Sequence, residues 1–164
     1  MKKGLWAAFL LLLLADFGSK RGAIDHIPAV LWNGGYPFGG WGIFQWGEVT
    51  FSLNFVTNTG AAWGLFSGHS TLLFFLRMGI VSALIAYLLF FNRTPLPRYP
   101  LWLIVTGAIG NAIDYCLYGH VIDFLHFTFW GHSFPLFNLA DSYITLGAIA
   151  FFFASRTAKV SPSP

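Results

Sequence analysis

Three of the six acidic residues in this 164-residue sequence lie in one stretch, residues 110–147: Asp114, Asp123 and Asp141. Asp114 and Asp141 stand inside runs apolar enough to cross a bilayer. A carboxylate in hydrocarbon is costly unless it faces a polar cavity or a partner, so such an acid indicates a functional site. Two carboxyl groups that share a site divide their protons, one serving as acid and one as base. We predict that Asp123 and Asp141 form a catalytic pair at the outer edge of a membrane.

An asparagine stands three residues before each acid of the apolar runs: Asn111 before Asp114, and Asn138 before Asp141. On a helix, residues i and i+3 share a face. The spacing predicts that each helix presents an amide and an acid together to the interior of a helix bundle.

The composition excludes a water-soluble protein, because 56% of the residues are hydrophobic and only 9% are charged, against roughly a quarter charged in soluble domains. The net charge of +3 does not indicate nucleic-acid binding, because pairs of basic residues flank the apolar runs, as is typical of the cytoplasmic side of membrane proteins. The pairs are Lys2 and Lys3, Arg93 and Arg98, and Arg156 and Lys159. The single cysteine excludes an intrachain disulfide and a zinc site of four cysteines.

The hydrophobic pattern predicts an all-α integral membrane protein: a four-transmembrane-helix bundle with a small β-containing platform on the extracytoplasmic side. The length suits one domain, residues 1–164, with both termini in the cytoplasm. Residues 48–57 alternate apolar and polar side chains as a half-buried strand does, and residues 119–129 are also strand-like. The predicted helices are about residues 4–20, 71–91, 100–117 and 136–154, and the extracytoplasmic segments are 21–70 and 118–135.

The first apolar run is short for a spanning helix, so a removable secretory signal is an alternative interpretation. No small-x-small cleavage site follows it, and Asp16, Lys20 and Arg21 close the run instead. At ~1.5 Å per residue, Asp16, Asp114 and Asp141 each lie ~20 Å from the cytoplasmic end of their helix. We therefore expect all three at one level rather than staggered through the membrane as a proton relay would be.

Five motifs, in order along the chain, resemble those of the lipoprotein signal peptidases (signal peptidase II): DFGSK, NTGAAWG, GNAID, GHVIDF and FNLADSYITLG. The resemblance spans roughly residues 5–153. It implies an aspartyl endopeptidase of the bacterial cytoplasmic (inner) membrane that removes signal peptides from diacylglyceryl-modified prolipoproteins, cleaving just before the lipidated cysteine. It also implies membrane lipid as a partner, inhibition by cyclic lipopeptides of the globomycin type, a monomer, and no metal, cofactor or nucleic acid.

The resemblance also implies roles for single residues. Asp123 and Asp141 match the two catalytic aspartates of the family. Asp16 and Lys20 match a pair on the first helix, and their i, i+4 spacing independently predicts a local ion pair. The residues that match polar groups around the family's substrate channel are Asn58, Asn111, Asp114 and Asn138.

The chain departs from the family pattern at two places. Position 115 is tyrosine where the family usually has arginine, so a guanidinium that would hold the substrate is missing there. Arg77, near the outer start of the second predicted helix, is a candidate replacement. The segment between Lys20 and Asn58 is longer and more aromatic than usual, and residues 22–47 within it are predicted to be a loop. Its Trp, Phe and Gly residues between positions 32 and 46 either cover the bound peptide or anchor the protein in the headgroup region.

Other interpretations of the same residues remain open. A small proton-coupled transporter or channel would use the same intramembrane acids, and a non-catalytic scaffold is a third alternative. Cys116 and His120 have the spacing of a thiolate and its base. His120, His126 and His132 recur every six residues, which matches no zinc-site spacing, so we expect their imidazoles to face water at the headgroup boundary.

Overall fold

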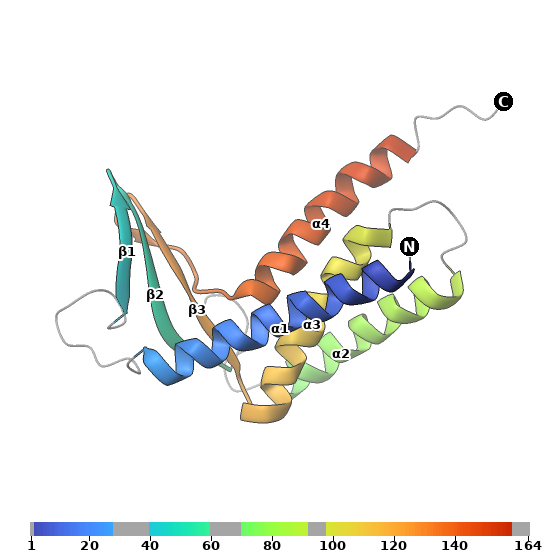
Figure 1. The fold of residues 1–164 in the computed structure, drawn as a ribbon, viewed down its shortest axis with the longest axis horizontal. Helices are drawn as coiled ribbons and strands as arrows, with labels where there is room; N and C mark the ends of the chain where they lie inside the picture. Colours follow the sequence, from blue (N-terminus) through green and yellow to red (C-terminus); the bar gives the residue numbers. More distant parts are fainter. Residues whose placement is uncertain (1, 28–39, 60–69, 92–97, 159–164) are drawn as a thin grey trace.

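The computed structural model describes residues 2–27, 40–59, 70–91 and 98–158. Four helices pack together, and an antiparallel sheet stands at one end of them (Figure 1). The elements are α1 (Lys2–His26), β1 (Trp41–Trp46), β2 (Val49–Asn58), α2 (Ser70–Ala86), a π-helical turn η3 (Tyr87–Phe91), α3 (Arg98–Tyr118), β3 (Val121–Phe129), β4 (His132–Ser133) and α4 (Leu139–Ala158).

Helix α3 is the central helix and contacts the other three. Its contact with α4 is close because glycines face that partner. A Cβ added at Gly110 would lie 3.2 Å from the Cβ of Ala140, and one added at Gly147 would lie 2.7 Å from the Cγ1 of Ile104. Small residues let helix backbones approach in this way in membrane proteins. The close approach brings the C-terminal half of α3 against the N-terminal end of α4, where several of the predicted site residues lie.

The sheet has the order β1-β2-β3-β4, and all its pairs are antiparallel. The register of β2 against β3 shifts between Leu53 and Val56, so that Val56 pairs with Asp123 and Asn58 pairs with Val121. Such a bulge re-aims the side chains that follow it. Asn58 and Asp123 thereby come within hydrogen-bonding distance at the end of the sheet nearest the helices.

Among the described residues, one helix, Arg98–Tyr118, has the length and mean hydropathy (1.3) to cross a membrane, and Phe74–Phe90 forms a shorter apolar helix. The prediction of four helices with a small sheet is therefore confirmed, whereas the number of membrane spans stays a prediction.

The predicted strands at 48–57 and 119–129 are confirmed as β2 and β3. The predicted loop 22–47 is wrong at both of its described ends. Helix α1 continues to His26, because the i, i+4 ion pair of Arg21 and Asp25 supports another turn and Ala23 is buried against the sheet. Strand β1 occupies Trp41–Trp46, paired with β2. Residues 28–39, and most of the NTGAAWG motif, lie outside the described part of the chain.

Candidate active site

Asn138 and Asp141 form a capping box at the start of α4. The Oδ1 of Asn138 accepts the backbone N–H of Asp141 at 2.9 Å, and the Oδ2 of Asp141 accepts the backbone N–H of Asn138 at 3.2 Å. Such a reciprocal pair satisfies N–H groups that a helix start leaves without partners. The prediction that Asn138 lies on a helix beginning near residue 136 is therefore wrong, because α4 begins at Leu139 and Asn138 caps it.

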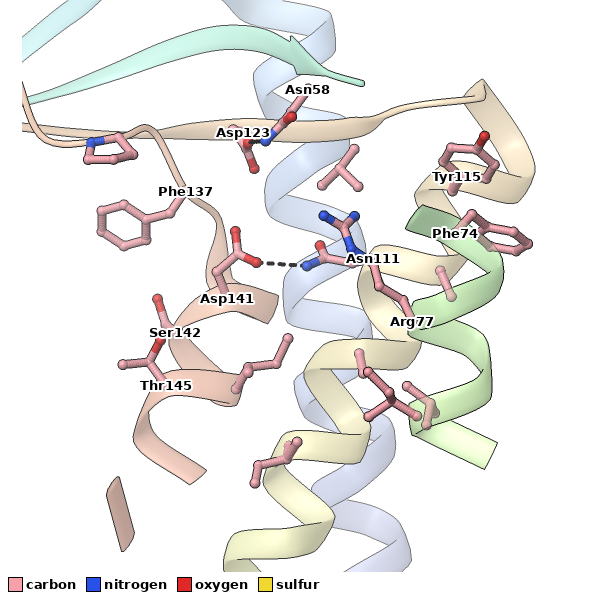
Figure 2. Close-up of a pocket in the computed structure, with 18 of the residues that line it drawn as sticks. Asn58, Phe74, Arg77, Asn111, Tyr115, Asp123, Phe137, Asp141, Ser142 and Thr145 are labelled. Atoms are coloured by element: carbon pink, nitrogen blue, oxygen red, sulfur yellow. Dashed lines mark hydrogen bonds between the residues drawn. The ribbon is translucent and has the colours of Figure 1, made fainter. Parts of the chain in front are cut away.

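Asp123 comes from β3 and is held by two amides. The Nδ2 of Asn58 donates to its Oδ2 at 2.8 Å, and the Nδ2 of Asn138 donates to its Oδ1 at 2.8 Å. The side chain of Asn138 thus contacts Asp123 through its nitrogen and the backbone of Asp141 through its oxygen. Figure 2 shows the two carboxyl groups pointing toward each other, one from the strand above and one from α4 below.

The environment of Asp123 favours its protonated form. Burial raises the pKa of this carboxyl from 3.8 to about 7, and the charge of Asp141 contributes to the rise. The hydrogen bonds from Asn58 and Asn138 and the charge of Lys20 lower the pKa, but burial outweighs them. Asp123 is therefore a carboxyl group that exchanges a proton near neutral pH, as an acid catalyst must.

Lys20 lies at the centre of a buried polar network. Its Nζ is 2.8 Å from the Oδ2 of Asp16 and 2.8 Å from the Oδ2 of Asp114, and it donates to the Oδ1 of Asn111 at 3.0 Å. The predicted ion pair of Asp16 and Lys20 is confirmed, and Asp114 is a second partner that the local spacing did not indicate. Lys20, Asp16 and Asp114 are at most 2% exposed, and a buried cation with two anionic partners is compatible with an apolar interior.

Asp16 and Asp114 each hold the backbone beside one of the predicted catalytic residues. The Oδ1 of Asp16 accepts the N–H of Ala140 at 2.8 Å, directly before Asp141. The Oδ2 of Asp114 accepts the N–H of Ile122 at 3.1 Å, directly before Asp123. The two acids therefore link the elements that carry the pair to the buried Lys20.

A cavity of about 870 Å³ opens beside the pair, between α2, α3, α4 and the end of the sheet. Asp123, Asp141, Asn58 and Asn111 line it, whereas the other predicted site residues do not. Most of the remaining lining is apolar, including Phe74, Val81, Leu84, Ile104, Phe134, Leu136 and Phe137. The structure thus divides the predicted residues into a set that faces the cavity and a supporting set behind it: Asp16, Lys20, Asp114 and Asn138.

The capping role of Asn138 was not predicted from the sequence. The signal was present in the Asn-x-x-Asp spacing directly before an apolar run, which is typical of a helix start. The position of Arg77 relative to the acidic pair was not predicted either. Arg77 and Tyr115 both line the cavity.

The prediction that all three histidines face water is wrong for His126, which is 1% exposed. Its Nε2 lies 2.7 Å from the Oγ of Ser133, and its Nδ1 lies 3.4 Å from the Oγ of Ser52. Burial lowers the pKa of this imidazole. Its position in β3 follows from the alternation of the strand, which places His126 on the face opposite Asp123. Within the described ranges, no three histidine, cysteine or acidic side chains are grouped closely enough to hold a metal ion.

A buried carboxyl group and a half-buried one, joined by amides and set beside an apolar cavity between helices, have the arrangement of a membrane-embedded aspartic peptidase. The family model described as "Signal peptidase (SPase) II" matches residues 8–157, and the chain belongs to that family. It is a peptidase that removes signal peptides from prolipoproteins. The resemblance found in the five motifs is thereby confirmed.

Individual relatives agree with the family. A lipoprotein signal peptidase of Chlamydia pneumoniae is 42% identical over 107 residues, which are 64% of each chain. One of Chlamydia caviae is 35% identical over 132 residues, covering 78% of this chain and 80% of the relative. A solved structure described as a bacterial membrane enzyme superposes with a TM-score of 0.76 at 26% identity, covering 99% of this chain and 94% of the other. The protein is accordingly embedded in a bacterial membrane.

Proposed function

We propose that Asp123 and Asp141 together cleave the peptide bond just before the diacylglyceryl-modified cysteine of a prolipoprotein. Asp141 takes a proton from water, and the water oxygen attacks the carbonyl carbon. Asp123, whose raised pKa of about 7 keeps it protonated below neutral pH, protonates the carbonyl oxygen. The C–N bond then breaks, and the amine leaves with a proton from the pair. The observation that carries this proposal is the Asn138 side chain, which contacts Asp123 and the backbone of Asp141 at once.

The supporting residues have separate tasks in this proposal. Asn58 and Asn111 face the cavity and each donate one N–H to a carboxylate of the pair, at 2.8 Å in both cases. Asp16 and Asp114 hold the adjoining backbone, and Lys20 neutralises them. This division supports a site in which water and peptide meet the pair from the cavity side only.

The apolar cavity and the basic pairs support the membrane arrangement. We propose a single domain with four spans in the bacterial cytoplasmic membrane, both termini in the cytoplasm, and the pair toward the extracytoplasmic face. In this arrangement the cavity would receive the end of the signal peptide together with the lipidated cysteine that follows it, and a cyclic lipopeptide inhibitor of the globomycin type would occupy the same space. We further propose that the protein acts as a monomer. The transporter alternative has less support, because Asp16 and Asp114 bind one lysine instead of forming a staggered relay.

The test is cleavage of a lipidated precursor by the Asp123→Asn and Asp141→Asn variants in detergent micelles. Both substitutions preserve side-chain size, so we expect folded proteins whose kcat falls at least about a thousandfold. Asp25→Asn is the matched control, since Asp25 is an exposed aspartate whose partner is Arg21, and it should cleave normally. Near-full cleavage by Asp123→Asn would contradict the assignment, and proton flux into vesicles would favour a transporter.

A further inference from the structure

Arg77 lies on the side of α2 that faces the cavity. Phe74, Arg77, Met78 and Val81 all line the cavity, and their spacing of three and four residues defines one helix face. Figure 2 shows the side chain of Arg77 extending from α2 into the cavity, toward the part where Asn111 and Asp141 lie. An arginine within an apolar helix is costly in a membrane, and its position toward a cavity indicates a function.

The cavity contains one basic side chain among the described residues that line it, and this is Arg77. The acidic pair lines the same cavity, and most of the other lining side chains are apolar. A substrate that occupies this cavity must place the polar groups of its backbone or its lipid linkage in an apolar space. A guanidinium offers several N–H donors in a plane and no acceptor, so it matches carbonyl oxygens.

Tyr115 forms part of the wall of the cavity. Its ring stacks on that of Phe74 with centroids 4.4 Å apart and an angle of 13° between the planes, and its hydroxyl donates to the Oγ1 of Thr71 at 3.4 Å. The stack joins α3 to the turn of α2 directly before Arg77. In Figure 2 the two rings lie together beside the start of α2. Tyr115 therefore packs against the helix that carries Arg77, and the guanidinium of Arg77 remains the group that can donate hydrogen bonds to a substrate in the cavity.

We propose that Arg77 is a substrate-binding residue whose guanidinium donates to a carbonyl oxygen of the lipidated precursor and holds it across the cavity from Asp123 and Asp141. This inference rests on the proposed function. Carbonyl oxygens occur both in the peptide backbone and in the acyl esters of the lipid, and the same guanidinium chemistry binds either one.

The experiment compares Arg77→Met and Arg77→Lys with the wild type, measuring kcat and KM for precursors with ester-linked and with ether-linked lipid chains. Nonionic detergent micelles are used, so that no lipid phosphate competes for the guanidinium. We expect Arg77→Met to raise KM about tenfold with little change in kcat, and Arg77→Lys to recover part of the loss, because a charged donor remains. A rise with both precursors identifies a peptide carbonyl. A rise confined to the ester-linked precursor identifies a lipid ester.

Arg21→Met is the matched control, because Arg21 lies near the outer end of α1, is about half exposed and pairs with Asp25. Its KM should equal that of the wild type. Thermal unfolding of Arg77→Met confirms that the bundle is intact. A KM within about twofold of wild type for Arg77→Met, or an equal loss in Arg77→Lys and Arg77→Met, would overturn the proposal. Failure of the proposed function appears separately, as cleavage that survives in Asp123→Asn.

Discussion

Lys20 determines which end of the Asn111 amide faces Asp141. The Nζ of Lys20 donates to the Oδ1 of Asn111 at 3.0 Å, and the Nδ2 of Asn111 donates to the Oδ1 of Asp141 at 2.8 Å. Because a lysine ammonium has donors only, the amide oxygen must face it and the amide nitrogen must face the carboxylate. A residue on α1 thereby orients a hydrogen bond to a proposed catalytic residue on α4 without contacting it.

Replacing Lys20 by methionine should lower both stability and activity. The substitution leaves Asp16 and Asp114 buried without their cation, and breaking a buried ion pair in this way costs about 3–5 kcal/mol. The Asn111 amide also loses the partner that orients it, so kcat should fall more than KM rises. Thermal unfolding and cleavage kinetics in detergent measure the two effects.

Arg21→Met is the control for this prediction, because Arg21 and Asp25 have the same i, i+4 spacing and a similar distance of 2.9 Å, but their side chains are 51% and 44% exposed. An exposed pair contributes about 0–1 kcal/mol. Equal destabilisation by Lys20→Met and Arg21→Met would show that burial of the Lys20 network does not matter to the fold.

Asn138→Ser and Asn138→Ala should separate the two roles of Asn138. Serine can still accept the N–H of Asp141 as a helix cap, so the serine variant should be about 1 kcal/mol more stable than the alanine variant. Alanine has no donor, and the serine hydroxyl stands nearer the backbone than the amide nitrogen that donates to Asp123. We therefore expect both variants to lose this contact and to lose cleavage to a similar degree. Denaturation midpoints and kcat values test this difference. Full activity in the serine variant would mean that the contact from Asn138 to Asp123 is not needed.

Gly110→Ala should disturb the link between Asp16 and α4. A Cβ at position 110 would lie 2.6 Å from the Oδ2 of Asp16 and 3.2 Å from the Cβ of Ala140, so the carboxylate or the helix must move. We expect a loss of about 1–3 kcal/mol, as for other overpacked sites, together with lower kcat. Gly18→Ala on α1 is the control, since nothing lies within 4 Å of its added Cβ. A Gly110→Ala protein as stable and active as Gly18→Ala would contradict the predicted contact.

The cleavage rate should fall as pH rises through about 7, because Asp123 loses the proton that it donates. The pKa of Asp123 is raised on folding, so its favourable contribution to stability is complete below 3.8 and is lost as pH rises through about 7. Rates measured across neutral pH should show this decline. The hydrogen bond from Asn58 lowers the pKa of Asp123, so Asn58→Leu should move the decline to higher pH. A constant rate from acid to alkaline pH would exclude Asp123 as the acid.

The local pattern of the sequence is sufficient for several features. The alternation of residues 48–57 predicted β2, the strand-like stretch 119–129 was confirmed as β3, and the i, i+4 spacing predicted the pair of Asp16 and Lys20. The positions of Asp16, Asp114 and Asp141 along their helices predicted that these acids lie at one level, and the network around Lys20 agrees with that prediction. These features depend on residues within a few turns of each other, for which periodicity is a direct physical signal.

The tertiary structure alone decided which distant groups meet. The contacts of Asn58 with Asp123, of Lys20 with Asn111 and of Asp16 with Ala140 span 65, 91 and 124 residues. The sequence also could not show that Asn138 contacts both elements of the pair, that His126 is buried, or that Arg77 points into the cavity. These arrangements depend on how α3 and α4 pack through their glycines and on the register of the sheet, and side-chain spacing within one element carries no information about either.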